Sequence, residues 1–214
     1  MKVWLTVLVL ILLHACGNQH RPEQPLVETP DLLHGIAAFT SDSLVNVVIE
    51  IPAGTTQKWE VSKETGQIEW ERIYPDSLRI IDYLAYPANY GFVPQTLLPE
   101  TTGGDGDPVD VFVLGPSIAR EQIVSVKIVG IIHMLDDHES DSKLLAVSAD
   151  NKGLNAETYE MLVTNYPGVL EILQTWLSHY KGQGRVEILS VQDEKQAIRY
   201  LKEAHNDYIN MKNE

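Results

Sequence analysis

The sequence predicts an α+β fold, in which a small closed OB-like β-barrel is flanked by C-terminal helices. Two observations lead to this prediction. Short β-branched or alternating segments crowd residues 44–149, which is typical of strands in a small barrel. Apolar residues then recur at intervals of three and four between residues 156 and 211, which is typical of helices. With 214 residues, 44% of them hydrophobic, the chain fits one globular domain plus a short appendage.

Local patterns place the individual strands. A β-branched run covers residues 44–52 and ends at Pro52, so it predicts a strand. Residues 57–62 and 66–73 alternate polar and apolar side chains around a turn at 63–66, which predicts a hairpin. Further strands are predicted at residues 109–115, 123–135, 143–149 and 186–191.

Two helical segments follow the strands. Residues 156–180 have apolar side chains at helical spacing, and Pro167 is expected to break or restart this helix. Residues 193–211 form the second predicted helix, for which Asp193 is the expected N-cap.

The N-terminus has the features of a signal peptide at residues 1–15. Lys2 supplies a positive start, and the apolar residues 3–13 are too few to span a bilayer comfortably as a mature helix. The only cysteine of the chain, Cys16, ends this stretch in a sequence that resembles a bacterial lipobox, although His14 departs from the usual pattern. We therefore expect cleavage before Cys16 and its modification by lipid. An uncleaved N-terminal anchor and an ordinary secretion signal are the alternatives.

The domain organisation follows from this reading. Residues 16–43 contain proline and polar residues without periodicity, so they are predicted to be a tether, and residues 44–214 are the folded domain. The expected location is the cell envelope, with the domain lipid-anchored to a membrane and facing the periplasm or the exterior. A cytoplasmic location is the alternative.

The charge of the chain excludes one class of partner. The formal net charge is −14, whereas nucleic-acid binding requires a basic surface. Metal cations can nevertheless join an acidic protein to a polyanion.

Acidic residues gather in two clusters, each after or before a predicted strand. Asp105, Asp107 and Asp110 lie within six residues, and their mutual repulsion favours a divalent cation between them. Oxygen ligands without paired histidines or cysteines favour Mg²⁺, Mn²⁺ or Ca²⁺ over zinc. The second cluster, residues 136–141, could meet the first at one end of the barrel.

Simpler interpretations of these clusters stay open from the residues alone. Both clusters could be solvated acidic turns, since aspartate and glycine are common turn residues. An EF-hand is disfavoured, because Pro108 interrupts the loop and its twelfth position is not glutamate. We expect His138 to be a solvated loop residue rather than a ligand.

The run DGDPVDVFVLGP, residues 105–116, resembles the signature of the soluble family I inorganic pyrophosphatases. Other segments resemble further elements of this family and occur in the family's order across residues 45–181. The resemblance implies Mg²⁺-dependent hydrolysis of inorganic pyrophosphate to two orthophosphates, with several ions per site and Mn²⁺ as a possible substitute. These segments are VVIEIPAG, QKWEV, YPANYGFVPQTL, the pair Asp136 and Asp141 with Lys143, and Tyr180-Lys181.

The same resemblance implies roles for the carboxylates. Residues matching Asp105, Asp110 and Asp141 hold the principal metals, and Asp110 would bridge the two ions that bind the attacking water. Asp107 would be the general base toward that water. Asp136, with Glu50, would help to place further metals.

The resemblance also implies a set of phosphate-binding side chains. Lys58 and Glu60 share one face of a predicted strand, and Lys143 follows Asp141 by two residues. From the residues alone, Lys58 and Glu60 could be a surface ion pair, and the tyrosines could be packing residues. The implied substrate-binding residues are Lys58, Glu60, Tyr86, Tyr90, Lys143, Tyr180, Lys181 and one arginine.

Two residues compete for the arginine. The family has an arginine about eight residues before the first tyrosine of its YPxNYG segment. Arg72 matches without gaps from Gly66 but requires a six-residue insertion before Tyr86, whereas Arg79 nearly keeps the spacing. We prefer Arg79, because residues 74–77 have turn composition and can accommodate the extra residues.

The family implies a homo-oligomer, and pyrophosphate is the expected small-molecule partner. A second hypothesis is a metal- or phosphate-binding lipoprotein without turnover. A third, a nucleic-acid-binding small barrel, conflicts with the charge.

Overall fold

The computed structural model describes residues 30–150 and 153–213, in which seven strands share one sheet. Its neighbours run in the order β1-β6-β7-β10-β8-β11, and β9 pairs with β8. The bounds are β1 Val45–Ile51, β6 Asn89–Phe92, β7 Asp110–Leu114, β8 Ile123–Asp136, β9 Glu139–Ser140, β10 Lys143–Ser148 and β11 Val186–Asp193.

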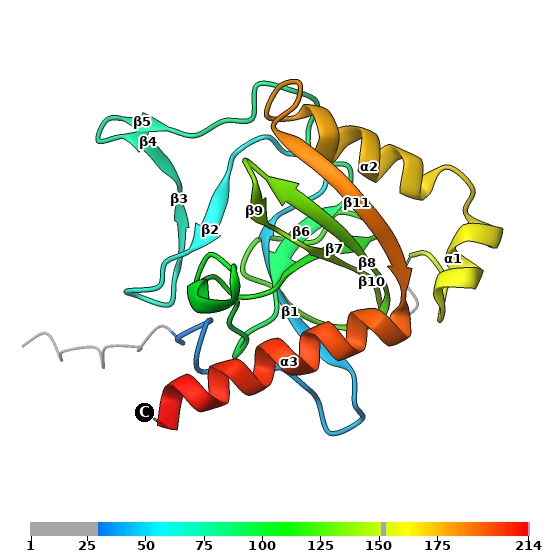
Figure 1. The fold of residues 1–214 in the computed structure, drawn as a ribbon, viewed down its shortest axis with the longest axis horizontal. Helices are drawn as coiled ribbons and strands as arrows, with labels where there is room; N and C mark the ends of the chain where they lie inside the picture. The colour runs from blue at the N-terminus through cyan, green and yellow to red at the C-terminus, as the bar shows by residue number, and fades with distance from the viewer. Residues whose placement is uncertain (1–29, 151–152, 214) are drawn as a thin grey trace, which may run out of the picture.

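An additional pairing between β1 and β8 closes the sheet into a ring of β1, β6, β7, β10 and β8 (Figure 1). All pairings in this ring are antiparallel except that of β7 with β10. The long strand β8 takes part in two of them and also pairs with β11. The predicted small closed barrel is therefore confirmed.

Two small hairpins lie outside the ring. Strands β2 (Trp59–Val61) and β3 (Ile68–Trp70) form the hairpin predicted at residues 57–73. Strands β4 (Arg72–Tyr74) and β5 (Ser77–Leu78) form a second hairpin that projects from the body of the molecule (Figure 1). The predicted strand to residue 73 is therefore divided between the two hairpins, and the turn composition at residues 74–77 does form a turn.

Three helices follow, as the sequence predicts. Residues 166–168 interrupt the first predicted helix at Pro167 and Gly168, giving α1 (Tyr159–Asn165) and α2 (Val169–His179). Helix α3 (Glu194–Asn213) begins after Asp193, whose carboxylate accepts hydrogen bonds from the backbone N–H groups of residues 195 and 196. A single 3-10 turn, η1, covers Glu100–Thr102. None of the helices among the described residues is long and apolar enough to cross a membrane.

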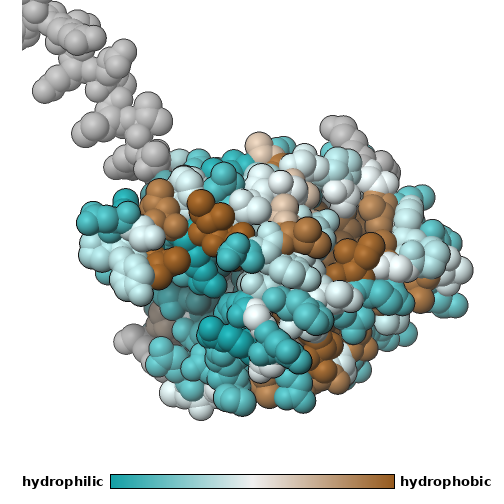
Figure 2. Space-filling model, turned by 90° about the horizontal axis from the view of Figure 1, so that it is seen from above, coloured by the Kyte–Doolittle hydropathy of each residue, from teal (hydrophilic) through white to brown (hydrophobic). Residues whose placement is uncertain are grey.

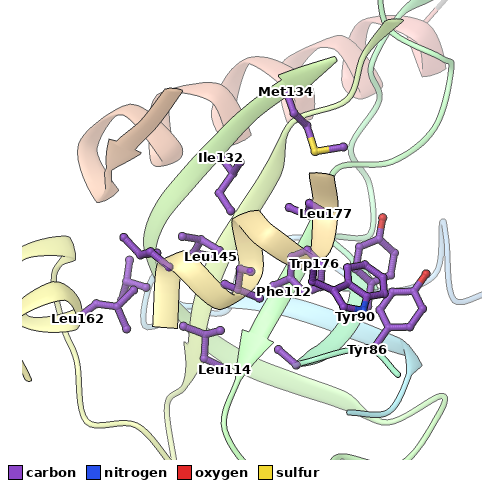
Figure 3. Close-up of a cluster of buried hydrophobic side chains, with 14 of the residues drawn as sticks. Tyr86, Tyr90, Phe112, Leu114, Ile132, Met134, Leu145, Leu162, Trp176 and Leu177 are labelled. Atoms are coloured by element: carbon purple, nitrogen blue, oxygen red, sulfur yellow. The ribbon is translucent and has the colours of Figure 1, made fainter. Parts of the chain in front are cut away.

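Alternation along the strands divides the core into two parts. Phe112 and Leu114 face a cluster that includes Trp176 and Leu177 of α2, which Figure 3 shows in close-up. Val111 and Val113 face a second cluster, which includes Leu201 of α3. Burial of each such side chain contributes about 1.5–3 kcal/mol. The two clusters fix the helices against the barrel on which the site is built.

The folded unit includes residues that were predicted to be tether. Leu32 and Leu33 are buried beside Phe92 of β6, and Ala38 is buried in the cluster that contains Val45. The predicted boundary at residue 44 is therefore too late. The predicted tether is mostly polar and has no periodicity, so nothing in the sequence indicated that a few of its apolar side chains are buried. The predicted signal peptide, Cys16 and the first part of the tether lie outside the described residues.

Candidate active site

The first residues of two parallel strands form the centre of the site. Asp110 begins β7, Lys143 begins β10, and the two residues are partners in the parallel register. The buried ammonium group of Lys143 forms ion pairs with the carboxylates of both Asp110 and Asp141. Burial alone would lower the pKa of Lys143, but these two carboxylates raise it well above its usual range. The two acidic clusters thus meet at one end of the barrel, as predicted.

The loop before β7 presents the other two aspartates of the signature. Gly106 has a φ of 77°, a conformation that side chains rarely adopt. The backbone N–H of Asp107 donates to the carboxylate of Asp105 at 2.9 Å, which closes the turn. Lys63 of the β2–β3 turn pairs with the Asp107 carboxylate. Burial raises the pKa of Asp105, and the nearby aspartates raise it further.

Asp136, at the end of β8, completes the carboxylate group. One of its oxygens pairs with Lys181. The other, Oδ1, is buried and has no hydrogen-bond partner among the described residues. A buried carboxylate oxygen without a partner is costly, so this atom has an unmet capacity to bind a donor or a cation.

A hairpin supplies the opposite wall. Lys58 and Glu60 flank Trp59 and lie 3.3 Å apart between Nζ and Oε2, and Lys58 also approaches Glu71 at 4.0 Å. A further carboxylate, that of Glu50 on β1, contacts this hairpin. It is 3% exposed and accepts a hydrogen bond of 2.7 Å from the backbone N–H of Val61. Burial raises the pKa of Glu50 to about 8, although the charge of Lys58 opposes this shift.

Three tyrosines lie close together beside the site, and Tyr90 lines its cavity. The rings of Tyr86 and Tyr90 lie 5.4 Å apart, and Trp176 stacks on Tyr180 at 4.5 Å (Figure 3 labels Tyr86, Tyr90 and Trp176). Lys143 Nζ lies 5.6 Å from the Tyr90 ring. Burial raises the pKa of Tyr86 to about 12 and raises the pKa values of Tyr90 and Tyr180 as well. All three phenols therefore stay protonated at neutral pH and can donate hydrogen bonds.

Asn89 joins this segment to its neighbours. Its side-chain oxygen accepts hydrogen bonds from the backbone N–H groups of Ala53 and Ile118, and its amide donates to the carbonyls of Val113 and Pro116. The buried amide thus joins β6 to the ends of β1 and β7. Tyr90, the next residue, is positioned by this network.

The two candidate arginines lie on either side of the base of the β4–β5 hairpin. Arg79 donates two hydrogen bonds to Glu71, of 2.7 and 3.0 Å. It lines a hollow with Tyr180 and Lys181, and its pKa is lowered by burial but raised overall by Glu71, Tyr180 and Tyr86. Arg72 is exposed, and its guanidinium donates to the carbonyl of Pro75. A projecting hairpin thus separates the two arginines along the chain, and Arg79 lies in the hollow with Tyr180.

The two walls enclose a cavity of about 530 Å³. Residues from both lie on its surface: Glu50, Lys58, Glu60, Arg72, Tyr90, Asp107 and Asp110. The smaller hollow of about 260 Å³ is lined by Arg79, Tyr180, Lys181 and Arg185.

The carboxylates fit a hard cation by chemistry, although their present partners are lysines. Among the described residues, no group of three His, Cys, Asp or Glu side chains is arranged to hold a metal ion. Instead, Asp107, Asp110, Asp136 and Asp141 each pair with a lysine. All these donors are carboxylate oxygens, and Asp136 Oδ1 is unpaired among the described residues, so the set suits Mg²⁺ or Mn²⁺ rather than zinc. His138 is exposed, as predicted.

Several residues near the site have no counterpart in the sequence predictions. Lys63 and Glu71 are among them, and both could have been inferred from their place on the same hairpin as Lys58. Ser142, between Asp141 and Lys143, faces the opposite way and contacts His133 Nδ1 at 2.9 Å. No sequence signal indicated this contact, because it depends on the pairing of distant strands.

Comparisons with known proteins agree with this geometry. A model of the inorganic pyrophosphatase family matches residues 47–209. The inorganic pyrophosphatase of Campylobacter jejuni is 34% identical over 172 residues, which cover 77% of this chain and 91% of the relative. Its counterpart in Neisseria meningitidis serogroup A is 30% identical over 165 residues, covering 75% of this chain and 86% of that protein.

Solved structures show the same architecture. The type I inorganic pyrophosphatase of Toxoplasma gondii matches with a TM-score of 0.79 at 26% identity, over 86% of this chain and 89% of that one. The type I enzyme of P. falciparum has a TM-score of 0.76 at 23% identity, a similarity of fold alone. This chain covers 64% of that longer protein, and the match includes 86% of this chain.

Proposed function

Because the chain belongs to the inorganic pyrophosphatase family, we propose that it hydrolyses inorganic pyrophosphate to two orthophosphates in a Mg²⁺-dependent reaction. The observation that carries the proposal is a buried lysine that pairs with two partly buried carboxylates beside a cavity with a further lysine in its lining. Asp110 and Asp141 share Lys143, and Asp110 lines the cavity together with Lys58 of the other wall. Such a site has donors for both a divalent cation and a polyanion.

The aspartates are the proposed metal ligands. Asp105, Asp110 and Asp141 would hold the principal Mg²⁺ ions, and Asp136 with Glu50 would help to place further ones. Bound Mg²⁺ supplies positive charge to the phosphoryl oxygens and lowers the pKa of water. Mn²⁺ has similar ligand preferences and is the expected substitute.

The cations and phenols of the chain orient the substrate. Lys58, Arg79 and Lys143 bind phosphoryl oxygens, and the protonated hydroxyls of the tyrosines donate hydrogen bonds to them. Because these groups are fixed before the substrate arrives, charge that develops during the reaction meets donors already in place. The proposed donors are Tyr86, Tyr90, Tyr180 and Lys181 together with the three cations.

Asp107 is the proposed general base. Its carboxylate is 47% exposed on the side chain and lines the cavity, so it can reach a water molecule there. It accepts the proton of the attacking water as the water oxygen approaches phosphorus. Lys63 pairs with Asp107 and holds this carboxylate at the surface of the cavity.

A pyrophosphatase assay on the purified full chain tests the proposal. We expect Mg²⁺-dependent release of phosphate from pyrophosphate, and a loss of at least about 100-fold in kcat for both Asp107→Ala and Asp110→Ala. Asp207→Ala on α3, outside the main cavity, is the matched control. Binding of pyrophosphate without release would favour the phosphate-binding lipoprotein, and a rate unaffected by both variants would refute the mechanism.

The N-terminal sequence supports a membrane location for this activity. We propose that Cys16 carries a lipid that anchors the enzyme in the cell envelope, facing the periplasm or exterior. Labelling with a radioactive fatty acid in a bacterial host should mark the wild type and not Cys16→Ser. Label retained by the variant would contradict the anchor. So would a wild type that carries no label and is found in the soluble fraction. The homo-oligomer implied by the family is a separate proposal, which the molar mass in solution tests.

A further inference from the structure

The hairpin that carries Lys58 and Glu60 is not joined to the barrel by strand pairing. Among the described strands, β2 pairs with β3 alone, in a sheet of two strands. Asp110 and Lys143, in contrast, lie within the seven-stranded sheet. Some other contact must therefore fix the position of Lys58 relative to the carboxylates.

Arg120 makes such a contact. Its Nε donates a hydrogen bond of 3.0 Å to the carbonyl oxygen of Glu50 on β1. Its guanidinium carbon lies 3.8 Å from the centroid of the Trp59 ring. One side chain thus contacts the barrel through the backbone of β1 and the hairpin through an aromatic ring.

Trp59 is well placed to transmit this contact. It stands between Lys58 and Glu60, and since side chains alternate along a strand, its ring points to the opposite face. The ring is also stacked on Trp70 of β3 at 5.2 Å between centroids. Arg120 and Trp70 therefore cover Trp59 with two planar groups, and a fixed Trp59 fixes the direction of Lys58 on the other face.

A second tie joins the same two elements. The carboxylate of Glu50 accepts a hydrogen bond from the backbone N–H of Val61. The backbone of Glu50 is thus held by Arg120 while its side chain holds β2. Both ties meet at Glu50, whose side chain lines the cavity, whereas Arg120 is not among the residues that line it.

From this geometry we propose that Arg120 is a positioning residue, which holds the β2–β3 hairpin so that Lys58 reaches the phosphate subsite. The inference rests on the proposed function of Lys58. Arginine suits this role because a planar guanidinium can stack on an aromatic ring while its Nε–H donates in the ring plane. Lysine in this position has neither the planar face nor a donor at the same point.

The first test separates substrate binding from turnover. Arg120→Met keeps the length and removes the donor and the charge, and Arg120→Lys keeps the charge alone. Both should raise the KM for pyrophosphate by about tenfold with kcat within about threefold, the pattern of a lost binding interaction. Arg199→Met, an exposed arginine on α3, is the control and should leave both constants unchanged. A KM for Arg120→Met within twofold of the control would overturn the proposal.

A double-mutant cycle identifies the route of the effect. If Arg120 acts through Lys58, then Arg120→Met should change the KM by less than about twofold in a Lys58→Met background. The same tenfold increase in that background would refute the proposed route, since the effect would then be independent of Lys58. The Arg120→Lys variant keeps the test valid if Arg120→Met folds poorly, which its thermal unfolding would reveal.

A binding measurement keeps this inference distinct from the proposed function. Inorganic phosphate titrated with Mg²⁺ into the protein should bind several-fold more weakly to Arg120→Met than to Arg199→Met, whether or not the wild type hydrolyses pyrophosphate. Tryptophan emission should also shift in Arg120→Met, because Trp59 loses the cation against its ring. Phosphate affinity and emission both equal to those of the control would overturn the positioning role, whereas an inactive wild type with weakened phosphate binding in the variant would refute only the catalytic proposal.

Discussion

The two walls of the site are built in different ways. On the barrel wall, Lys143 is 4% exposed and is placed by the main-chain register of β7 and β10. On the hairpin wall, Glu60 is 47% exposed and Lys63 54% exposed, and β2 pairs only with β3 among the described strands. The backbone therefore fixes the proposed metal side, whereas side-chain contacts fix much of the proposed phosphate side.

This difference has a functional meaning. A metal centre requires several ligands at closely defined positions, and a closed ring of strands holds them with little freedom. Phosphate groups change position as the substrate becomes product, and cations on a separate hairpin can bind them in more than one position. Substitutions on the two walls should accordingly differ in kind: loss of stability and turnover on the barrel wall, and loss of affinity on the hairpin wall.

The largest effect is expected on the barrel wall. In metal-free protein, Lys143→Ala leaves Asp110 and Asp141 without their common cation and should lower the free energy of unfolding by about 3–5 kcal/mol. Urea unfolding in the presence of a chelator measures this change. Lys202→Ala, an exposed lysine on α3, should change it by less than about 0.5 kcal/mol. Equal effects of the two substitutions would show that the buried pairing does not matter to stability.

The next largest effect concerns Arg79, which lines the smaller hollow. Arg79→Ala should lower kcat/KM for pyrophosphate by about 100-fold, about 2.7 kcal/mol, because a charged donor to the substrate is lost. Arg72→Ala, with its guanidinium exposed and bonded to Pro75, should lower it by less than about threefold. Steady-state kinetics of both variants decide between them. The reverse order of effects would show that Arg72 is the phosphate-binding arginine.

A smaller effect depends on pH. The pKa of the Glu50 carboxyl is raised from 4.5 to about 8, chiefly by burial. Between these values the folded metal-free protein holds a proton that the unfolded chain has released, so the contribution of Glu50 to stability is lost as the pH rises from 4.5 to about 8. The slope from this residue is at most about 1.4 kcal/mol per pH unit.

Unfolding by urea at several pH values, in the presence of a chelator, tests this expectation. Glu50→Gln should flatten the decline of stability between about pH 5 and about pH 8, which lies between the ordinary and the raised pKa of Glu50. Glu64→Gln, on the exposed turn between β2 and β3, should keep the slope of the wild type. Parallel curves for the wild type and Glu50→Gln would contradict the raised pKa.

The smallest effect is expected on the projecting hairpin. Hydrophobic and hydrophilic residues are mixed on the face of the molecule that Figure 2 shows from above. On the projecting hairpin, Tyr74 is 70% exposed. Tyr74→Ser should therefore change the free energy of unfolding by less than about 0.5 kcal/mol. Thermal unfolding by circular dichroism checks this. A loss above about 1 kcal/mol would mean that the β4–β5 hairpin supports the wall beside it.

Local patterns in the sequence were sufficient for most elements of the fold. The β-branched run before Pro52 became β1, and the break at Pro167 separates α1 from α2. These features depend on neighbouring residues only. The short strand β6 was not predicted, because YPANYGF lacks alternation and its conformation depends on pairing with β1 and β7.

The candidate site shows the same division. The aspartates around Asp107 could be predicted because they stand in one short motif. The pairing of Lys143 with Asp110 could not, because it depends on the register of strands 33 residues apart. Arg120 gave no signal either, since its contacts with Glu50 and Trp59 join three segments that are separate in the sequence.

The parallel register of β7 and β10 makes activity a sensitive measure of correct folding. Side chains alternate along a strand, so a shift of one residue would turn Lys143 away from Asp110 and bring Ser142 or Leu144 to its place. A misfolded molecule of this kind would keep its compact shape and lose its catalytic centre. After refolding, the ratio of active to compact molecules would therefore measure the fidelity with which two distant strands found their partners.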